Sequence, residues 1–453
     1  MTSRRVREKP TKFRGAKPGI FSGIAAKVKR FLAKRKISKQ KRIINLPKVT
    51  SSSAKVAIFL AISLVVIVPL VLVIYPNLRG FYSIKFEKEA GDNSEITKEW
   101  KGEKRLNLLL IGLDRNSEEY AFVDALAVLS INPEKKELGV FTINPNIEVY
   151  LPDDRKTYSF KKIYNAGKLR EKPESLDILV DSVEELISVR IDRYMSVDAE
   201  DLESIINVYG DITTEVGFSI KDEDIKSGKD EFSIAAGKNR LDGFELLALA
   251  SADALGSDNK LTNQQEIIKG LVLSLDEIDK LYEIKNVSEE LSAKVRSNLT
   301  GSEFRRLIWL LKQIPFDGIK LGETKESSVV AGTDGSLIPI MERIDNDVSE
   351  VFFNVDVQRE QARVEVLNGT SKGGLGSRKA RWVSNAGAKV INVGNSRDPY
   401  LLTTVYTTEP AKYVNTLKEI EDIFGVKIVL VEGDFPYRHT GDIVVVIGEN
   451  SLE

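Results

Sequence analysis

The sequence contains no cysteine and only one histidine, His439, and each shortage excludes a class of chemistry. Without cysteine there can be no disulfide, thiolate nucleophile or cysteine-based zinc site. A single histidine excludes metal sites built from several imidazoles. The residues before His439 are typical of a surface turn, so we interpret it as an ordinary loop histidine in preference to a general base. Any chemistry must use carboxylates, amines, hydroxyls or a metal held by oxygen atoms.

Acidic residues are almost absent from residues 1–55, although the whole chain has a formal net charge of -1. This segment contains eighteen Lys and Arg residues and one acid, Glu8. Its apolar residues recur at helical spacing, which favours a helix lying on an anionic membrane surface over a nucleic-acid-binding tail. The apolar residues are Ile20, Phe21, Ile24, Val28, Phe31 and Leu32. We therefore interpret residues 1–55 as a basic cytoplasmic tail on the inner leaflet, and nucleic acid is the less favoured partner.

Residues 56–75 lack charge altogether and read VAIFLAISLVVIVPLVLVIY. An α-helix of about twenty apolar residues crosses roughly 30 Å of hydrocarbon. Pro69 is tolerated in a membrane helix, and no small-residue cleavage pattern follows, so we predict an uncleaved transmembrane helix. The basic flank is expected to stay in the cytoplasm. We therefore expect a single-pass cell-membrane protein whose chain from Pro76 onward lies outside the cytoplasm.

Beyond this helix the pattern predicts a polar stalk at 76–104 and a mixed α/β domain at 105–345. Three apolar runs of strand length open the domain, and helical patterns alternate with strands after them. The expected strands lie at 105–115, 122–131 and 137–143, and the expected helices at 176–189 and 199–210. Such sheets gather their functional residues in loops at the strand ends.

Residues 346–360 are interpreted as a linker, and 361–450 as a small α/β domain that binds a wall polymer or a protein partner. Gly373 and Gly374 precede an expected helix at 377–387, but the glycine spacing fits neither a Walker loop nor a dinucleotide fingerprint. An anion could bind at this helix start with help from Lys372 or Arg378. A tight turn that leads into a helix is the favoured interpretation.

Several motifs occur together in an order and spacing that resemble the LytR-CpsA-Psr family of bacterial cell-envelope proteins. The motifs are LLLIGLDR, VDALAVLSINPEKKELGVFTI, RYMSVDAEDLESIINVYGDI, LDGFELLALA and NQQEIIKGLVLSL. The segment from ARVEVLNGTSKGGLGSRKARWVSNAGAKVINVGN to DIVVVIGEN resembles the LytR C-terminal domain. Together they cover most of residues 105–450.

The resemblance implies a phosphotransferase that moves a glycopolymer from a polyprenyl-pyrophosphate carrier to peptidoglycan. In the family, aspartates hold magnesium and arginines grip the phosphates, as suits hard oxygen ligands and guanidinium forks. Asp114 and Asp124 match the paired aspartates, which makes them the expected magnesium ligands. Arg115 lies one residue from an arginine position, and Lys260 stands in for another arginine, so both are expected to bind phosphate.

Most of the family's other arginines are absent from this sequence. Phe122 stands where one is expected, and Asn144, Pro145 and Asn146 replace a Pro-Arg-Asp motif. Two more positions hold Ser251 and Asp253, and another holds Asn263. Because arginine clamps contribute factors of ~10³ or more in rate, we expect the family reaction to be lost. The predicted function is then binding of an envelope polymer or of a polyprenyl-phosphate lipid.

Three alternatives stay open at this point. An active transferase could use a relocated arginine such as Arg155 or Arg170, and a membrane-bound nucleic-acid regulator could act through the basic tail. The two aspartates could instead cap helices or lie in solvent. Gln264 and Gln265 are expected on a helix surface or as supports of site residues, not as reacting groups.

Overall fold

The structure, a computed structural model, describes most of the chain beyond the predicted anchor. The described residues are 75–89, 92, 98–115, 121–151, 155–169, 175–221, 232–252, 256–275, 284–332 and 336–452. They belong to one compact unit, Pro69–Glu453. The predicted basic tail, nearly all of the predicted transmembrane helix, Arg170 and Asp253 lie outside these residues. Within the part that the structure describes, no helix is long and apolar enough to cross a membrane.

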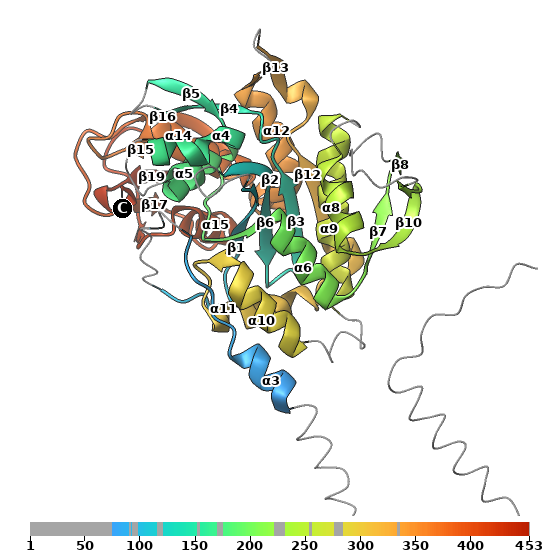
Figure 1. The fold of residues 1–453 in the computed structure, drawn as a ribbon. Coiled ribbons are helices and arrows are strands. Elements are labelled where there is room, and N and C mark those ends of the chain that lie inside the picture. The colour runs from blue at the N-terminus through green and yellow to red at the C-terminus, as the bar shows by residue number, and fades with distance from the viewer. Residues whose placement is uncertain are drawn as a thin grey trace, which may run out of the picture. The chain divides into compact units, whose positions relative to one another are not determined.

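A mixed six-stranded sheet organises the larger domain, in the order β11-β6-β1-β2-β3-β12 (Figure 1). The central strand β1 pairs antiparallel with β2 and parallel with β6, and β3 continues the sheet to β12. The strands are β1 (Leu106–Asp114), β2 (Phe122–Asn132), β3 (Glu137–Thr142), β6 (Arg193–Asp198), β11 (Arg296–Ser297) and β12 (Ile319–Glu323). The predicted mixed α/β fold is confirmed, and its first three strands match the expected runs to within one residue.

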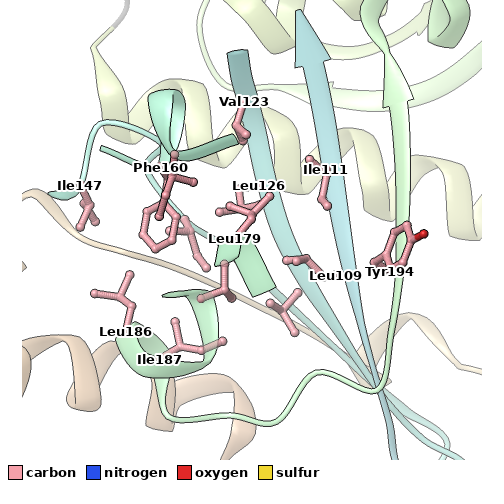
Figure 2. Close-up of a cluster of buried hydrophobic side chains, with 14 of the residues drawn as sticks. Leu109, Ile111, Val123, Leu126, Ile147, Phe160, Leu179, Leu186, Ile187 and Tyr194 are labelled. Carbon is pink, nitrogen blue, oxygen red and sulfur yellow. The ribbon is translucent and has the colours of Figure 1, made fainter. Parts of the chain in front are cut away.

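Both faces of this sheet are covered by helices, which explains why its strands are apolar on both sides. On one face, side chains of β1 and β2 pack against α4 (Phe160–Leu169), α5 (Ser175–Ile187) and α12 (Met341–Phe352). Figure 2 shows this core, which includes Leu109, Ile111, Val123, Leu126, Phe160, Leu179, Leu186 and Ile187. On the other face, Leu106, Leu108, Leu129 and Ile131 pack against α9 (Ser257–Ser274) and α11 (Gly301–Leu311).

Smaller elements surround the sheet. A third apolar cluster joins α6 and α8 to the β7-β10 pair, and α3 packs beside α10. The bounds are α3 (Tyr75–Tyr82), β4 (Glu148–Leu151), β5 (Lys156–Ser159), α6 (Ala199–Tyr209), β7 (Ile212–Val216), β8 (Ile220–Lys221), β9 (Ser233–Ile234), β10 (Gly237–Leu241), α8 (Gly243–Ser251), α10 (Ile284–Lys294), η4 (Phe316–Gly318), η5 (Glu326–Ser328), β13 (Val329–Ala331) and β14 (Leu337–Pro339). The helix expected at 199–210 is therefore α6.

The C-terminal part has its own five-stranded sheet, in the order β16-β15-β19-β17-β18. Its elements are α13 (Val355–Glu360), β15 (Arg363–Asn368), α14 (Leu375–Asn385), β16 (Lys389–Asn395), β17 (Thr404–Thr407), α15 (Val414–Phe424), β18 (Val429–Glu432), β19 (Ile443–Ile447) and η6 (Glu449–Ser451). Gly374 has φ 77° directly before α14, a left-handed conformation that glycine adopts without strain. Residues 346–360, expected to form a linker, lie largely in α12 and α13.

Candidate functional site

The carboxyl ends of β1, β3, β6 and β12 meet at one edge of the central sheet, together with the beginning of β2. The register shows this directly, because Asp114 at the end of β1 lies opposite Phe122 at the start of β2. Asp198 at the end of β6 lies opposite Leu113. Asp114 is exposed, and Asp124 follows Phe122 by two residues. The structure thus places both predicted aspartates at the same edge of the sheet.

An irregularity in the β1-β2 pairing determines where Asp124 lies. Leu113 pairs with Val123 and Gly112 pairs with Ala125, so Asp124 has no partner in β1. An extra residue of this kind forms a β-bulge, which often redirects a side chain near a functional site. The Asp124 carboxylate is directed to α9, where Lys260 Nζ lies 3.2 Å from Asp124 Oδ1. Lys260 itself is only 9% exposed, so this ammonium is largely shielded from water beside Asp124.

Arg115 is directed to the opposite face of the sheet from Lys260. Its Nε donates to Asp198 Oδ1 at 2.7 Å, and its Nη2 donates to Glu89 Oε1 at 3.1 Å. Ser196, which pairs with the core residue Ile111, donates to Glu89 Oε2 at 2.7 Å. Arg115 therefore has two carboxylate partners on the α4 side of the sheet, whereas α9 covers the other side.

The ionisation states of Glu89 and Arg115 are fixed by the groups around them. Burial alone would raise the pKa of Glu89, but the hydrogen bond from Ser196 and the charge of Arg115 hold it below its ordinary value. Burial would lower the pKa of Arg115, and the opposing effect of Asp198 and Glu89 raises it well above its ordinary value. Glu89 stays ionised and Arg115 stays protonated at any physiological pH.

A cavity of about 370 Å³ opens beside Glu89 and Arg115. It is lined by four cations and three carboxylates, with two further residues. The lining residues are Lys88, Glu89, Arg115, Ser196, Val197, Asp198, Asp201, Lys294 and Arg296. Lys294 Nζ lies 3.5 Å from Asp201 Oδ1, and Arg296 Nη1 lies 3.7 Å from Glu87 Oε2. The cavity has the size of a small-ligand site, but its walls are charged where such sites are usually apolar.

Asn144, Pro145 and Asn146 form a tight turn after β3. Asn144 Oδ1 accepts from the Asn146 backbone N–H at 3.0 Å, and Pro145 O accepts from the backbone N–H of Lys161 in α4 at 2.7 Å. Asn144 is buried, and its own N–H donates to Thr324 Oγ1. This loop leads from β3 into β4, is held against α4 by a hydrogen bond and offers no cation, so its role here is structural.

Gln264 and Gln265 are both buried in α9, so of the two expectations, a helix surface or a supporting role, the structure favours the second. Gln265 Nε2 lies 2.9 Å from three acceptors, Thr142 Oγ1, Gly322 O and Glu323 Oε2. It ties α9 to the ends of β3 and β12 and so helps to position Lys260, which precedes it on the same helix. The supporting role that the sequence suggested for Gln265 agrees with these contacts.

The other positions singled out from the sequence have ordinary partners. His439 Nε2 lies 2.7 Å from Asp434 Oδ1 in the C-terminal part, and Arg378 Nη1 lies 3.4 Å from Glu185 Oε2. Asn263 Nδ2 donates to the backbone oxygen of Leu249. Arg155 is exposed in the turn before β5.

A neighbouring ammonium opposes magnesium binding at Asp114 and Asp124. The Lys260 ammonium lies against Asp124 Oδ1, and its positive charge would repel a divalent cation at the same oxygen. Carboxylates are the hard ligands that magnesium prefers, and here one of the two is already neutralised.

Sequence reasoning missed the carboxylates that bind Arg115. Glu89 lies in the segment interpreted as a stalk, 26 residues before Arg115, and Asp198 lies 83 residues after it. Neither residue belongs to a local motif. The only available signal was that a long arginine side chain at the end of a buried strand requires an acidic partner.

The chain belongs to the LytR_cpsA_psr family, whose model matches residues 80–344, more than half of the sequence. A second family model, described as LytR cell envelope-related transcriptional attenuator, matches residues 361–450. Both resemblances identified from the sequence are thus confirmed. The chain is a cell-envelope protein of this family, related to polyisoprenyl-teichoic acid–peptidoglycan transferases.

Individual relatives are distant. The teichoic acid transferase TagV of Bacillus subtilis is 28% identical over 212 residues, which cover 44% of this chain and 51% of that protein. TagU of Bacillus licheniformis is 23% identical and matched over 43% of this chain and 60% of its own length. The chain thus spans between half and two thirds of these relatives. The crystal structure of Bacillus subtilis TagV aligns with a TM-score of 0.45 and 21% identity, covering 53% of this chain and 94% of that one.

Proposed function

We propose that this protein is a membrane-anchored, extracytoplasmic member of its family that binds an envelope polymer or a polyprenyl-phosphate lipid without transferring it. Residues 56–75 would form the anchor, and residues 1–55 would lie on the anionic inner leaflet. The support for this part of the proposal is the uncharged apolar run, which has the length of a membrane-spanning helix.

The contact between Lys260 and Asp124 carries the proposal that transfer is lost. A phosphotransferase of this kind needs cations that are available to the phosphate in the transition state. Lys260 is instead buried on Asp124, and Arg115 is held by Glu89 and Asp198 on the other face of the sheet. The cations expected to share one pyrophosphate are therefore divided between two faces, and each is already neutralised.

The charged cavity beside Arg115 is the proposed binding site. A phosphate group on a sugar would meet Lys88, Lys294 and Arg296, whose ion pairs are 3.2–3.7 Å long, while Arg115 stays bound to Glu89 and Asp198. The lining carboxylates could accept hydrogen bonds from sugar hydroxyls. A volume of about 370 Å³ suits a phosphorylated sugar unit. Lys260 does not line this cavity, so its proposed role changes from binding phosphate to neutralising Asp124.

Binding can be measured by titrating the full chain, in detergent, with a short-chain polyprenyl-pyrophosphate disaccharide. The double variant Lys88→Met/Arg296→Met should weaken binding by about tenfold, because it removes two of the four cations that line the cavity. Lys269→Met is the matched control, since Lys269 pairs with Glu266 on α9 and does not line the cavity. Equal affinity of the double variant and the wild type would contradict the proposed site.

An active transferase with rearranged cations is the second candidate, and one observation favours it. Asp114 and Asp124 remain at one edge of the sheet, as the resemblance requires. This candidate predicts that Mg²⁺ binds to the wild-type chain and that Asp114→Asn/Asp124→Asn abolishes the binding. Calorimetric titration with Mg²⁺ alone measures this directly.

A further inference from the structure

Two large aromatic side chains stand out from the surface near the first described helix. Tyr82, at the end of α3, is 67% exposed, and Trp309, in α11, is 64% exposed. Single exposed apolar residues are ordinary on soluble proteins. Exposed aromatics that gather with cations at one place mark an interaction surface.

Contacts between α3 and α11 place these residues together. The Arg305 guanidinium lies 5.0 Å from the centre of the Tyr82 ring, and Arg305 Nη1 donates to Tyr82 O at 3.2 Å. Trp309 follows Arg305 by one helical turn and so lies on the same face of α11. The rings of Phe81 and Tyr82 are 6.2 Å apart. We call Phe81, Tyr82, Arg305 and Trp309 the aromatic surface.

The opposite side of α11 explains why this face is directed outward. Phe304, Leu307, Leu310 and Leu311 are buried against the sheet. The helix is strongly two-sided, and polar residues are typical of the outward face of such a helix. A tryptophan there is the exception, and Lys312 lies one turn further along the same side.

The position of the aromatic surface in the chain indicates what it meets. The uncharged run 56–75 ends at Tyr75, where α3 begins. At 1.5 Å per residue, the seven steps from Tyr75 to Tyr82 span about 10 Å, enough to cross the roughly 5–8 Å headgroup region beyond the hydrocarbon. Figure 1 shows α3, α10 and α11 together at one end of the described domain.

We infer that the aromatic surface lies in the headgroup region of the membrane's outer leaflet, an inference that rests on the anchor proposed above. Tyrosine and tryptophan are enriched at membrane–water interfaces because their rings are apolar at one end and polar at the other. The exposed cations Arg79, Lys85 and Lys312 around the surface suit anionic lipid headgroups. The core of a protein interface is depleted in charge, so a bilayer is the better match for this mixture.

This contact would hold the domain at a fixed height and orientation above the bilayer. A tether at one point leaves a domain free to rotate, whereas a second contact through α11 removes that freedom. The chemical class of the ligand is a phospholipid headgroup, and no specific lipid is required.

Tryptophan fluorescence of the full chain in lipid nanodiscs tests the inference. The nanodiscs contain phosphatidylcholine and phosphatidylglycerol, with or without bromine on the acyl chains close to the headgroup. Trp309 is one of three tryptophans, so bromine should remove about a third of the emission from the wild type. Trp382 is buried in the C-terminal part, and the loss should disappear in Trp309→Phe.

A tryptophan placed elsewhere is the matched control. Tyr150 is 58% exposed and belongs to β4. Figure 1 shows β4 at the other end of the domain from α3, so Tyr150→Trp in the Trp309→Phe background should not be quenched. The inference would be overturned if the control tryptophan were quenched, or if Trp309 were not quenched in protein that co-elutes with nanodiscs. Neither result would contradict the proposed anchor. Failure of the wild-type chain to co-elute with nanodiscs would overturn the anchor, and the inference with it.

Discussion

Lys260 and Asp124 show how one residue pair can change what a sheet edge is able to bind. In a metal-dependent site, the negative charge of the carboxylate is available to bind the metal cation. Here the ammonium lies 3.2 Å from Asp124 Oδ1 and is largely shielded from water. The Asp124 side chain is 33% exposed, so the pair is partly open to water and its contribution to stability is modest.

Lys260→Met should increase the affinity for Mg²⁺ by about tenfold or more, since a methionine keeps the side-chain length but removes the repelling charge. The increase is measured by calorimetric titration of the purified chain with Mg²⁺. Lys269→Met, on the same helix but paired with Glu266, should leave the affinity unchanged. Equal Mg²⁺ affinity of Lys260→Met and the wild type would mean that Lys260 does not control Asp124.

Glu184, half-buried in α5, predicts a dependence of stability on pH. Burial raises its pKa to about 7, and the nearby charge of Lys379 opposes the shift. The folded protein therefore holds this proton more tightly than the unfolded chain, in which the pKa is about 4.5. The contribution of Glu184 to stability is thus greatest below about pH 4.5 and is lost as the pH rises to about 7.

The variant Glu184→Gln tests this expectation. Gln keeps an oxygen that can accept from the Ile191 N–H, a 2.7 Å hydrogen bond in the wild type, but it cannot titrate. Between about pH 5 and pH 7, its free energy of unfolding should fall less than that of the wild type, as measured by urea denaturation. Parallel pH profiles for the two proteins would show that Glu184 does not titrate in this range.

At the residue scale, the sequence identified charged side chains of the candidate site but not the residues that they contact. It placed Asp114 and Asp124 at one edge of the sheet and singled out Lys260 and Arg115. It did not show that Lys260 neutralises Asp124 or that Arg115 binds Glu89, because those contacts join segments 136 and 26 residues apart. Pairing across such distances depends on the folded sheet, which local patterns do not encode.

At the scale of elements, α11 joins the core of the domain to the aromatic surface. Thr300 Oγ1 accepts from the Glu303 N–H, and the Glu303 carboxylate accepts from the Thr300 N–H, so the helix begins with a capping box. Glu303 also binds Arg193 of β6 at 2.7 Å. The start of α11 is therefore fixed to the sheet, and Arg305 and Trp309 are held on its outer side.

Thr300→Ala should lower the free energy of unfolding by about 1 kcal/mol, because it removes the oxygen that caps the helix. Urea denaturation followed by circular dichroism measures the loss. Thr300→Ser keeps a capping hydroxyl and should lose at most a few tenths of a kcal/mol. If the alanine and serine variants were equally stable, the cap would contribute nothing.

The spacing of apolar residues predicted which helices and strands exist better than it predicted where they begin and how they pair. The apolar runs gave β1, β2 and β3 nearly to the residue. The helical pattern of α15 extends back to residue 409, but the helix begins only at Val414, after a turn in which the Lys412 N–H donates to Glu409 O. The bulge at Asp124 was not predicted, since inserting one residue changes the pairing of two strands without changing the apolar pattern of either.

For the molecule as a whole, Arg381 of α14 connects the C-terminal part to the larger domain. Its Nη2 lies 2.7 Å from Asp345 Oδ1 of α12, and its Nη1 donates to Glu185 O of α5 at 3.1 Å. Asn385, one turn further on, donates to the same Asp345 oxygen at 3.0 Å. The order of the two domains was readable from the sequence, but this contact was not, because its residues lie far apart along the chain.

Arg381→Ala should weaken the docking of the two parts by roughly 1.5–3 kcal/mol, the range for hydrogen bonds to charged groups. Differential scanning calorimetry should then show the C-terminal part unfolding at a lower temperature than the rest. Arg359→Ala is the matched control, because Arg359 is a mostly exposed arginine that pairs with Asp356 on its own helix. An unchanged thermogram for Arg381→Ala would mean that other contacts hold the parts together.

The central claim, that this family member binds its ligand without transferring it, is tested most directly by turnover. Full-length protein in detergent would be incubated with a polyprenyl-pyrophosphate saccharide, a peptidoglycan acceptor and Mg²⁺, beside the Asp114→Asn/Asp124→Asn variant. We predict that the saccharide binds but that no polyprenyl phosphate is released above the level of the double variant. Mg²⁺-dependent release by the wild type, absent from the double variant, would contradict the account and establish an active transferase.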